Sequence, residues 1–264
     1  DVELPNLHPN LDQVEKLLEK DRKKKNPKIK GITFAHVLGN PPDMERLMDI
    51  INKYELIFLE DACDALGSTW KGKPLGSFGL MSTCSFFPAH HMTMGEGGFV
   101  ATSDHRYVFD EVGYNLKPLD MQAAMGLQQI KKLPEMHAKR KLHYFMQTEI
   151  WGKYSDRLML PTKMQEADPS WFGFLLTVKD DSPVSKAQMI SKLEDAKIQT
   201  RSYFTGNALL HPAYADLRKK YKDVQKAFPV ATKVTNDTFF LGVWPGALPE
   251  HFEHIKNTAK EIME

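Results

Sequence analysis

The sequence predicts an α/β protein in which a parallel or mixed sheet is covered by helices and is followed by a smaller second domain. Short β-rich runs alternate with segments whose apolar residues recur at helical spacing, and turn-forming residues separate the two kinds of segment. The alternation resumes after one long helical stretch. We therefore place a large domain at residues 1–149 and a small one at residues 150–264.

The first strand and helix have clear sequence signals. "KGITFAHVL" (residues 30–38) is β-rich and is ended by "GNPP". "DMERLMDIINKY" (residues 43–54) places its apolar residues on one helical face behind Asp43, a typical N-cap residue. "ELIFLED" (residues 55–61) then predicts a buried strand that ends on two acids.

Two further strands complete the predicted sheet, in "MSTCSFF" (residues 81–87) and "GGFVATS" (residues 97–103). A long helical stretch follows from about residue 120 to residue 154, where Pro134 predicts a kink or a break. The second domain is predicted to contain a strand, a helix and a strand, in "WFGFLLTV" (residues 171–178), "SKAQMISKLEDAK" (residues 185–197) and "IQTRSYF" (residues 198–204).

The composition favours a small-molecule partner. Lys and Arg total 35 against 34 Asp and Glu, which leaves a net charge of +1 and no global field to attract nucleic acid or an anionic membrane. No stretch has the roughly 18 apolar residues that a membrane span requires. The two cysteines, Cys63 and Cys84, lie in apolar stretches and exclude a disulfide framework. We expect a soluble, cytoplasmic protein.

Three clusters at predicted strand ends could carry chemistry. In the first, Glu60, Asp61 and Asp64 follow an apolar strand. A carboxylate at such a place can hold a cationic ring nitrogen, because opposite charges at close range keep both groups ionised. The alternative is that Asp61 or Asp64 caps a helix. In the second cluster, the hydroxyl of Ser85 can bind a phosphate or cap the local backbone.

The third cluster is the pair His90 and His91, which precedes a glycine-rich run at residues 95–98. Neighbouring side chains on an extended segment point to opposite faces, so at most one of the two faces a given pocket. A metal site would need further ligands at suitable spacing, and the sequence offers none. We predict no metal site at this pair.

Together the clusters resemble a known family. "EDACDALGSTWKGKPLGSFG", "CSFFPAHHMTMGEGG" and "GYNLKPLDMQAAMGLQQIKKL" resemble the sugar-modifying branch of the pyridoxal-phosphate aminotransferases, the DegT/DnrJ/EryC/StrS group. The resemblance begins near residue 30. It implies the PLP-dependent transferase fold (aspartate aminotransferase, type I), with a mixed, mostly parallel sheet flanked by helices and a smaller α+β carboxyl-terminal domain.

One substitution points to a subgroup. Where aminotransferases of this family hold a lysine that forms a Schiff base with the cofactor, this chain has His90. The replacement resembles the 3-dehydratases of deoxysugar and lipopolysaccharide biosynthesis, such as those that act on CDP-4-keto-6-deoxy-D-glucose. An imidazole cannot form a stable imine, yet its pKa near ~6.5 allows it to move protons at neutral pH. His90 is therefore the expected catalytic base.

The resemblance also implies a reaction and roles for other residues. Pyridoxamine 5′-phosphate (PMP), the amine form of pyridoxal 5′-phosphate (PLP), would serve to remove the C3 hydroxyl of a nucleotide-diphosphate-linked 4-keto-6-deoxyhexose, with His90 taking a proton from the cofactor's C4′ carbon. Asp61 would pair with the pyridinium nitrogen, and Ser85 would bind the cofactor phosphate. Asp64 falls near the ring, at a position where many relatives have glutamine.

Three more residues are implied by position. Asn115 matches an asparagine that reaches the phosphate in the neighbouring subunit, which implies a homodimer with shared active sites. Arg201 and Asn207 lie where relatives contact substrate. The simpler alternatives are a loop cap for Asn115 and a surface cation for Arg201.

Two departures from the family pattern bear on activity. Relatives begin with a longer segment that cradles the phosphate at a helix N-terminus and stacks an aromatic residue on the ring, so we expect the N-terminal part of the fold to be missing from this chain. Iron–sulfur members also carry a cysteine-rich insertion where this chain passes straight from Ser103 through Asp104 to His105.

Two cysteines cannot supply the four thiolate ligands of a cluster. A [2Fe-2S] cluster, with a reductase partner that delivers single electrons, is therefore expected only if a cysteine-rich segment is absent from the printed sequence. The alternatives are a cluster-free dehydratase that releases ammonia, or a non-catalytic scaffold. Retention of Asp61 and Ser85 argues against the scaffold.

Overall fold

A computed structural model describes residues 1–102 and 118–264, which form two compact units. Unit 1 comprises Asp1–Gln13, Leu142–Thr162 and Gly173–Glu264, and unit 2 comprises Val14–Lys141 and Lys163–Phe172. The chain passes between the units more than once, so no single position in the sequence separates them. The expected domain boundary between residues 149 and 150 stays a prediction.

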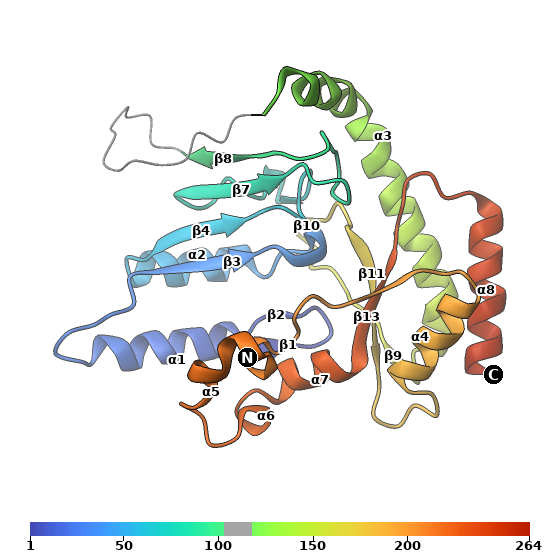
Figure 1. Cartoon of the computed structure of the whole chain (residues 1–264). Helices are drawn as coiled ribbons and strands as arrows, with labels where there is room; N and C mark the ends of the chain where they lie inside the picture. Colours follow the sequence, from blue (N-terminus) through green and yellow to red (C-terminus); the bar gives the residue numbers. More distant parts are fainter. Residues whose placement is uncertain (103–117) are drawn as a thin grey trace. The chain divides into compact units, whose positions relative to one another are not determined.

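A four-stranded mixed sheet forms the centre of unit 2 (Figure 1). Its order is β3 (Gly31–Ala35), β4 (Ile57–Asp61), β7 (Met81–Ser85) and β8 (Gly98–Thr102). The first three strands are parallel to one another, and β8 returns antiparallel to β7. The four strands predicted from the sequence are confirmed, as is the mixed character of the sheet.

The prediction that β4 is a buried strand was half wrong. Ile57 is 49% exposed, whereas the side chain of Phe58, on the opposite face, is 2% exposed. Successive side chains of a strand point to opposite faces, and only one face of β4 is covered by the described residues. An apolar run of this length does not reveal whether one face of a strand is buried or both.

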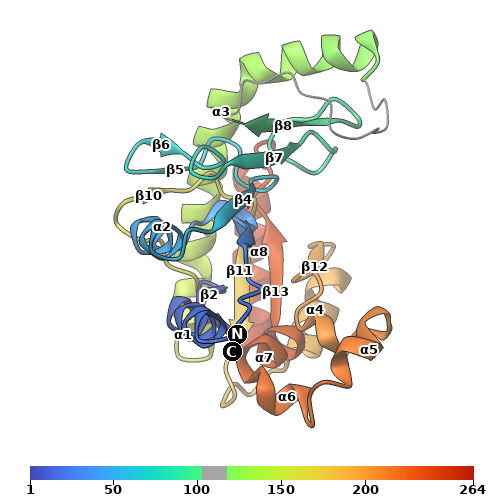
Figure 2. The ribbon, with the colours of Figure 1, turned by 90° about the vertical axis from the view of Figure 1, so that its left-hand side faces the viewer.

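Helix α2 (Met44–Lys53) forms where the apolar spacing predicted it and runs beside β3 and β4 (Figures 1 and 2). The carboxylate of Asp43 accepts a hydrogen bond from the backbone N–H of Arg46 at 3.0 Å, which satisfies one of the unpaired donors of the first turn. The apolar face of the helix is buried.

Helix α3 (Asp120–Trp151) continues through Pro134, so the chain does not break there. The ribbon nevertheless changes direction along the helix (Figure 2). Proline lacks the N–H that would bond to the preceding turn, and its ring crowds that turn, which makes a bend the expected result. Within residues 1–102 and 118–264, every helix is too short or too polar to traverse a bilayer.

Unit 1 contains an antiparallel sheet in the order β12 (Thr200–Ser202), β13 (Thr238–Gly242), β11 (Gly173–Val178) and β9 (Leu158–Met159). Helix α4 (Lys186–Asp195) begins with a reciprocal capping box between Ser185 and Gln188. The predicted strand, helix and strand are confirmed.

The remaining elements are short, apart from two terminal helices and α7. They are α1 (Leu11–Arg22), α5 (Ala215–Arg218), α6 (Val224–Ala227), α7 (Pro229–Asp237), α8 (Pro249–Met263), the strands β1 (Val2–Glu3), β2 (His8–Pro9), β5 (Thr69–Trp70), β6 (Lys73–Pro74) and β10 (Ala167–Asp168), and 3₁₀ turns at Val37–Gly39, Gly152–Tyr154, Ala208–Leu210 and Pro212–Tyr214.

A buried carboxylate fixes the loop that follows β6. Glu60 is 2% exposed and accepts hydrogen bonds from the N–H groups of Gly76, Phe78 and Gly79, and its Oε2 lies 2.9 Å from Nε2 of His36. Burial alone would raise the pKa of Glu60, but these hydrogen bonds outweigh it and hold the pKa below its ordinary value.

We predict that Glu60→Gln lowers the free energy of unfolding by about 2–4 kcal/mol at pH 7, because the amide cannot accept all of these bonds. The lowered pKa means that the ionised carboxylate stabilises the fold above the ordinary Glu pKa of about 4.3, and that this contribution is lost as the pH falls through the lower folded value. Urea unfolding measures both effects.

The exposed substitution Glu19→Gln in α1 is the matched control and should change stability by less than about 0.5 kcal/mol. Equal stability of the Glu60 variant and its parent at pH 7 would show that this carboxylate does not hold the loop.

Candidate functional site

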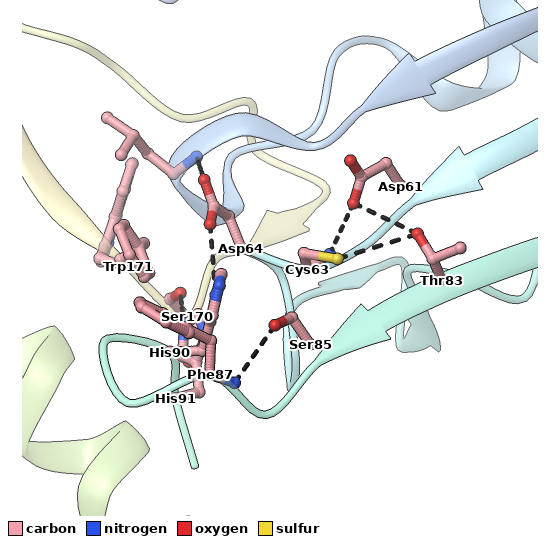
Figure 3. Close-up of polar contacts among 12 residues, drawn as sticks. Asp61, Cys63, Asp64, Thr83, Ser85, Phe87, His90, His91, Ser170 and Trp171 are labelled. Atoms are coloured by element: carbon pink, nitrogen blue, oxygen red, sulfur yellow. Dashed lines mark hydrogen bonds and ion pairs between the residues drawn. The ribbon is translucent and has the colours of Figure 1, made fainter. Parts of the chain in front are cut away.

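The carboxyl ends of β4 and β7 meet at one edge of the unit 2 sheet. The two strands are parallel and pair Asp61 with Thr83, so the residues that end each strand come together (Figure 3). Asp61 ends β4, and Ser85 ends β7. His90 and Asp64 lie in the loops that follow, and Figure 3 shows all four predicted residues around this edge. Chemistry in open α/β sheets commonly gathers at such strand ends.

Asp61 is held in place by its own turn and by the neighbouring strand. Its Oδ1 accepts the N–H of Cys63 at 3.0 Å and the hydroxyl of Thr83 at 3.4 Å. Oδ2 has no hydrogen bond within residues 1–102 and 118–264. Turns rather than a helix follow β4, so neither Asp61 nor Asp64 is a helix cap. One carboxylate oxygen of Asp61 is thus available to a ligand.

His90 lies between aromatic rings and carboxylates. Its ring centroid is 5.3 Å from that of Phe172 and 6.2 Å from that of Phe87, and its Nδ1 lies 3.5 Å from Oδ1 of Asp64. Burial lowers the pKa of His90, and the Cys63 carbonyl and the Asp61 charge only partly oppose this effect. The imidazole is therefore neutral at pH 7 and can accept a proton.

His91 has a different environment. It is 1% exposed, and its Nε2 lies 2.6 Å from the backbone oxygen of Ser170. Burial lowers the pKa of His91 to about 3. The adjacent histidines thus have separate surroundings, as expected, although the segment is a turn and not extended: the His90 N–H bonds to the carbonyl of Phe87 at 3.0 Å. His91 packs the interior of unit 2, and His90 faces the carboxylates.

Asp64 bridges two segments of unit 2. Its Oδ2 accepts the N–H of Leu38 at 3.4 Å while its Oδ1 faces His90. Burial raises the pKa of Asp64 to about 6; the Leu38 hydrogen bond opposes the rise, and the nearby Asp61 charge adds to it. The carboxyl group is mostly ionised at pH 7 and mostly protonated below pH 6.

Ser85 has a hydroxyl with donor capacity to spare. Its Oγ accepts the N–H of Phe87 at 3.2 Å, which uses a lone pair and leaves the O–H able to donate. The glycine run closes the same loop: Phe86 N–H bonds to the carbonyl of Gly97, whose φ of 143° suits only glycine. The capping alternative for Ser85 is thus compatible with phosphate binding.

The sequence interpretation missed Thr83 and Phe172. Thr83 lies two residues before Ser85, and strand periodicity places both side chains on one face, so the signal for Thr83 was available. Phe172 comes from a distant segment of unit 2 and had no local signal.

Three further expected residues are not among the described residues of unit 2. Asn115 lies outside the described residues, as does the expected insertion point between Ser103 and His105. Arg201 is exposed on β12 of unit 1. Asn207 is buried and caps a 3₁₀ turn, because its Oδ1 accepts the N–H of Leu209 and its Nδ2 donates to the Thr232 hydroxyl. Substrate contacts for Arg201 and Asn207 stay predictions.

The donor set at the edge fits a phosphorylated pyridine. Asp61 offers a carboxylate oxygen to a protonated ring nitrogen, Ser85 offers a hydroxyl to a phosphate, and His90 offers a neutral base without a covalent tether. Within the described part of the chain, no three His, Cys, Asp or Glu side chains are grouped as metal ligands.

Comparison with known proteins gives the family. The DegT/DnrJ/EryC1/StrS aminotransferase family matches residues 1–108 and 103–260. Lipopolysaccharide biosynthesis protein RfbH of Salmonella typhimurium is 33% identical over 99% of this chain and 68% of its own length. The dTDP-4-dehydro-2,6-dideoxy-D-glucose 3-dehydratase of Saccharopolyspora spinosa is 31% identical over 100% of this chain and 64% of its own length. The chain thus spans about two thirds of these relatives.

A solved structure of a related protein has a similar fold. The GDP-4-keto-6-deoxy-D-mannose-3-dehydratase of Escherichia coli with bound hydrated PLP superposes with a TM-score of 0.80 and 25% identity, covering 98% of this chain and 73% of that one. The fold is therefore that of the PLP-dependent aminotransferases, as the sequence predicted. The chain belongs to the DegT/DnrJ/EryC1/StrS aminotransferase family.

Proposed function

We propose that this chain carries the catalytic part of a PMP/PLP-dependent 3-dehydratase, which removes the C3 hydroxyl from a nucleotide-linked 4-keto-6-deoxyhexose. The observation that carries the proposal is His90, a neutral imidazole beside the Asp64 carboxylate, where aminotransferases of the family hold lysine. The names of the similar proteins support the reaction, because several are 3-dehydratases of 4-keto-deoxysugars linked to nucleotides.

Asp61, Ser85 and His90 have separate roles in this proposal. When bound, the cofactor supplies the amine that takes up the sugar ketone and a ring that accepts electrons. Asp61 holds the ring nitrogen protonated, and the bonds from Cys63 and Thr83 keep its carboxylate oriented. Ser85 donates its hydroxyl to the phosphate. His90 takes the proton from the C4′ carbon.

The aromatic residues beside His90 have a supporting role in this proposal. Phe87 and Phe172 lie around the imidazole and limit the access of water to it. Exclusion of water strengthens electrostatic interactions and keeps the base neutral.

The substrate class and partners belong to the proposal. The similar dehydratases are named for GDP-linked and dTDP-linked sugars, which supports a nucleotide sugar in general. We also propose a homodimer with shared sites, which the family resemblance supports, and a cytoplasmic location, which the two unpaired cysteines support. Mass photometry of the purified protein and cell fractionation test these two points.

The proposal includes an iron–sulfur cluster only if the natural protein has a cysteine-rich segment in addition to the printed sequence. The two family matches meet at residues 103–108, where the resemblance places the cysteine-rich insertion of the iron–sulfur members. The alignment with the RfbH protein spans 305 positions against 264 residues in this chain, so the relative has residues that this chain lacks. The intact mass of the natural protein distinguishes a cluster enzyme with a reductase partner from a cluster-free dehydratase.

We predict that the chain binds PMP with a saturable change in ring absorbance and that Asp61→Ala weakens this binding by about 10- to 100-fold. The reason is that a charge-assisted hydrogen bond contributes about 1.5–3 kcal/mol. Asp49→Ala removes an exposed carboxylate of α2 and should leave binding unchanged. A parent chain without any saturable signal would favour the scaffold alternative.

We predict that His90→Asn slows exchange of the C4′ protons of bound PMP by at least about 100-fold, since general-base catalysis contributes about 10²–10⁴. PMP affinity should change by less than about threefold, because the imidazole does not tether the cofactor. NMR of deuterium incorporation measures the rate. Exchange that persists in the variant would assign the base to another residue.

A further inference from the structure

Both carboxylate oxygens of Asp64 have a neighbouring protein group. One carboxylate oxygen is bonded to the N–H of Leu38, and the other is directed at Nδ1 of His90, 3.5 Å away (Figure 3). The two side chains are only 14% and 16% exposed. The carboxylate is therefore held from one side by backbone and faces the imidazole with the other.

The backbone at Leu38 supports a built contact. Leu38 has a φ of 54°, in the left-handed region that leucine rarely adopts, and in this conformation its N–H reaches Asp64. Such strain costs about 1–3 kcal/mol and persists where the surroundings require it. The Leu38 carbonyl accepts the N–H of Phe172, whose ring packs on His90, so the same turn holds both neighbours of the imidazole.

Nδ1 of His90 is buried and has no hydrogen bond in the described part of the chain. A buried N–H without an acceptor is costly, and the Asp64 carboxylate is in position to accept it. The distance of 3.5 Å exceeds an ordinary N–H···O bond by about 0.5 Å.

We infer that Asp64 is a positioning residue for His90: its carboxylate accepts the Nδ1 proton of the neutral imidazole and so leaves the Nε2 lone pair as the base. The use of that base rests on the proposed function, but the pairing itself does not. It replaces the cofactor contact expected for Asp64 from its sequence position. A carboxylate that fixes the tautomer of a catalytic histidine acts through the imidazole and not on the substrate.

The surrounding charges favour this protonation state. Asp64 is the acid in contact with His90; the Cys63 carbonyl and the Asp61 charge raise the pKa of His90, and the Arg140 charge lowers it. Burial lowers the pKa of His90 and raises that of Asp64 to about 6. Around pH 7 the carboxylate is therefore ionised while the imidazole is neutral. Below pH 6 Asp64 is protonated and no longer selects the Nδ1–H form.

Nitrogen NMR of the full chain, labelled at histidine and free of cofactor, tests the pairing directly. The His90 signals are assigned by their loss in His90→Gln. In the parent, Nδ1–H should be the major tautomer at pH 7.5 and lose its excess as the pH falls through about 6. In Asp64→Asn the ratio of Nδ1–H to Nε2–H should fall at least about fivefold, because the charged acceptor is gone. Asp49→Asn is the matched control and should leave the ratio unchanged.

Binding and exchange separate a positioning role from a cofactor contact. With PMP present, Asp64→Asn should slow C4′ proton exchange by about 10- to 100-fold, shift its pH profile and change PMP affinity less than about threefold. A large loss of affinity with unchanged His90 tautomers would make Asp64 a cofactor ligand and overturn the inference.

The remaining outcomes are also decisive. An unchanged tautomer ratio in Asp64→Asn would overturn the pairing whatever the enzyme does. If that variant fails to fold, the tautomer of the parent still decides, since a major Nε2–H form at pH 7.5 contradicts the pairing. Failure of the proposed function would appear separately, as an absence of C4′ exchange in the parent, and would leave the NMR result standing.

Discussion

The parallel pairing of β4 with β7 is the constraint on which the site depends. Its register sets Asp61 opposite Thr83. Because successive side chains point to opposite faces, Glu60 points into the interior and Asp61, the last residue of β4, points to the other face. A shift of one residue would exchange the two acids and remove both the buried anchor and the site carboxylate. The position of each acid along β4 therefore determines which one is buried and which one lies in the site.

The turn after β7 separates the two histidines. His91 lies in the interior against the Ser170 carbonyl, and His90 stays at the edge, where a partly dehydrated imidazole remains neutral. A neutral imidazole in place of lysine removes covalent attachment and keeps proton transfer, which changes the reaction open to an otherwise familiar fold. The identity of one side chain and its burial thus account for the proposed difference from an aminotransferase.

Local signals predicted much of the fold and the outline of the site. Asp43 and the apolar spacing behind it predicted α2, and the apolar runs predicted β3, β4, β7 and β8. Asp61 and Ser85 followed because strand ends gather at one edge of a parallel sheet. These features depend on residues close in the sequence, where periodicity and capping carry the information.

Contacts between distant segments could not be predicted. Leu38, Asp64 and Phe172 are brought around His90 by the folding of separate loops, and no spacing in the sequence encodes that meeting. The half-exposed state of β4 was missed for the same reason, since an apolar run does not say how many of its faces are covered.

A crystal structure of the protein with PMP tests the central claim most directly. The account predicts that the ring nitrogen lies within hydrogen-bond distance of Asp61, that the phosphate contacts the Ser85 hydroxyl, and that no covalent bond joins cofactor and protein. A pyridine ring bound away from the β4 and β7 strand ends, or a covalent link to a side chain, would contradict it.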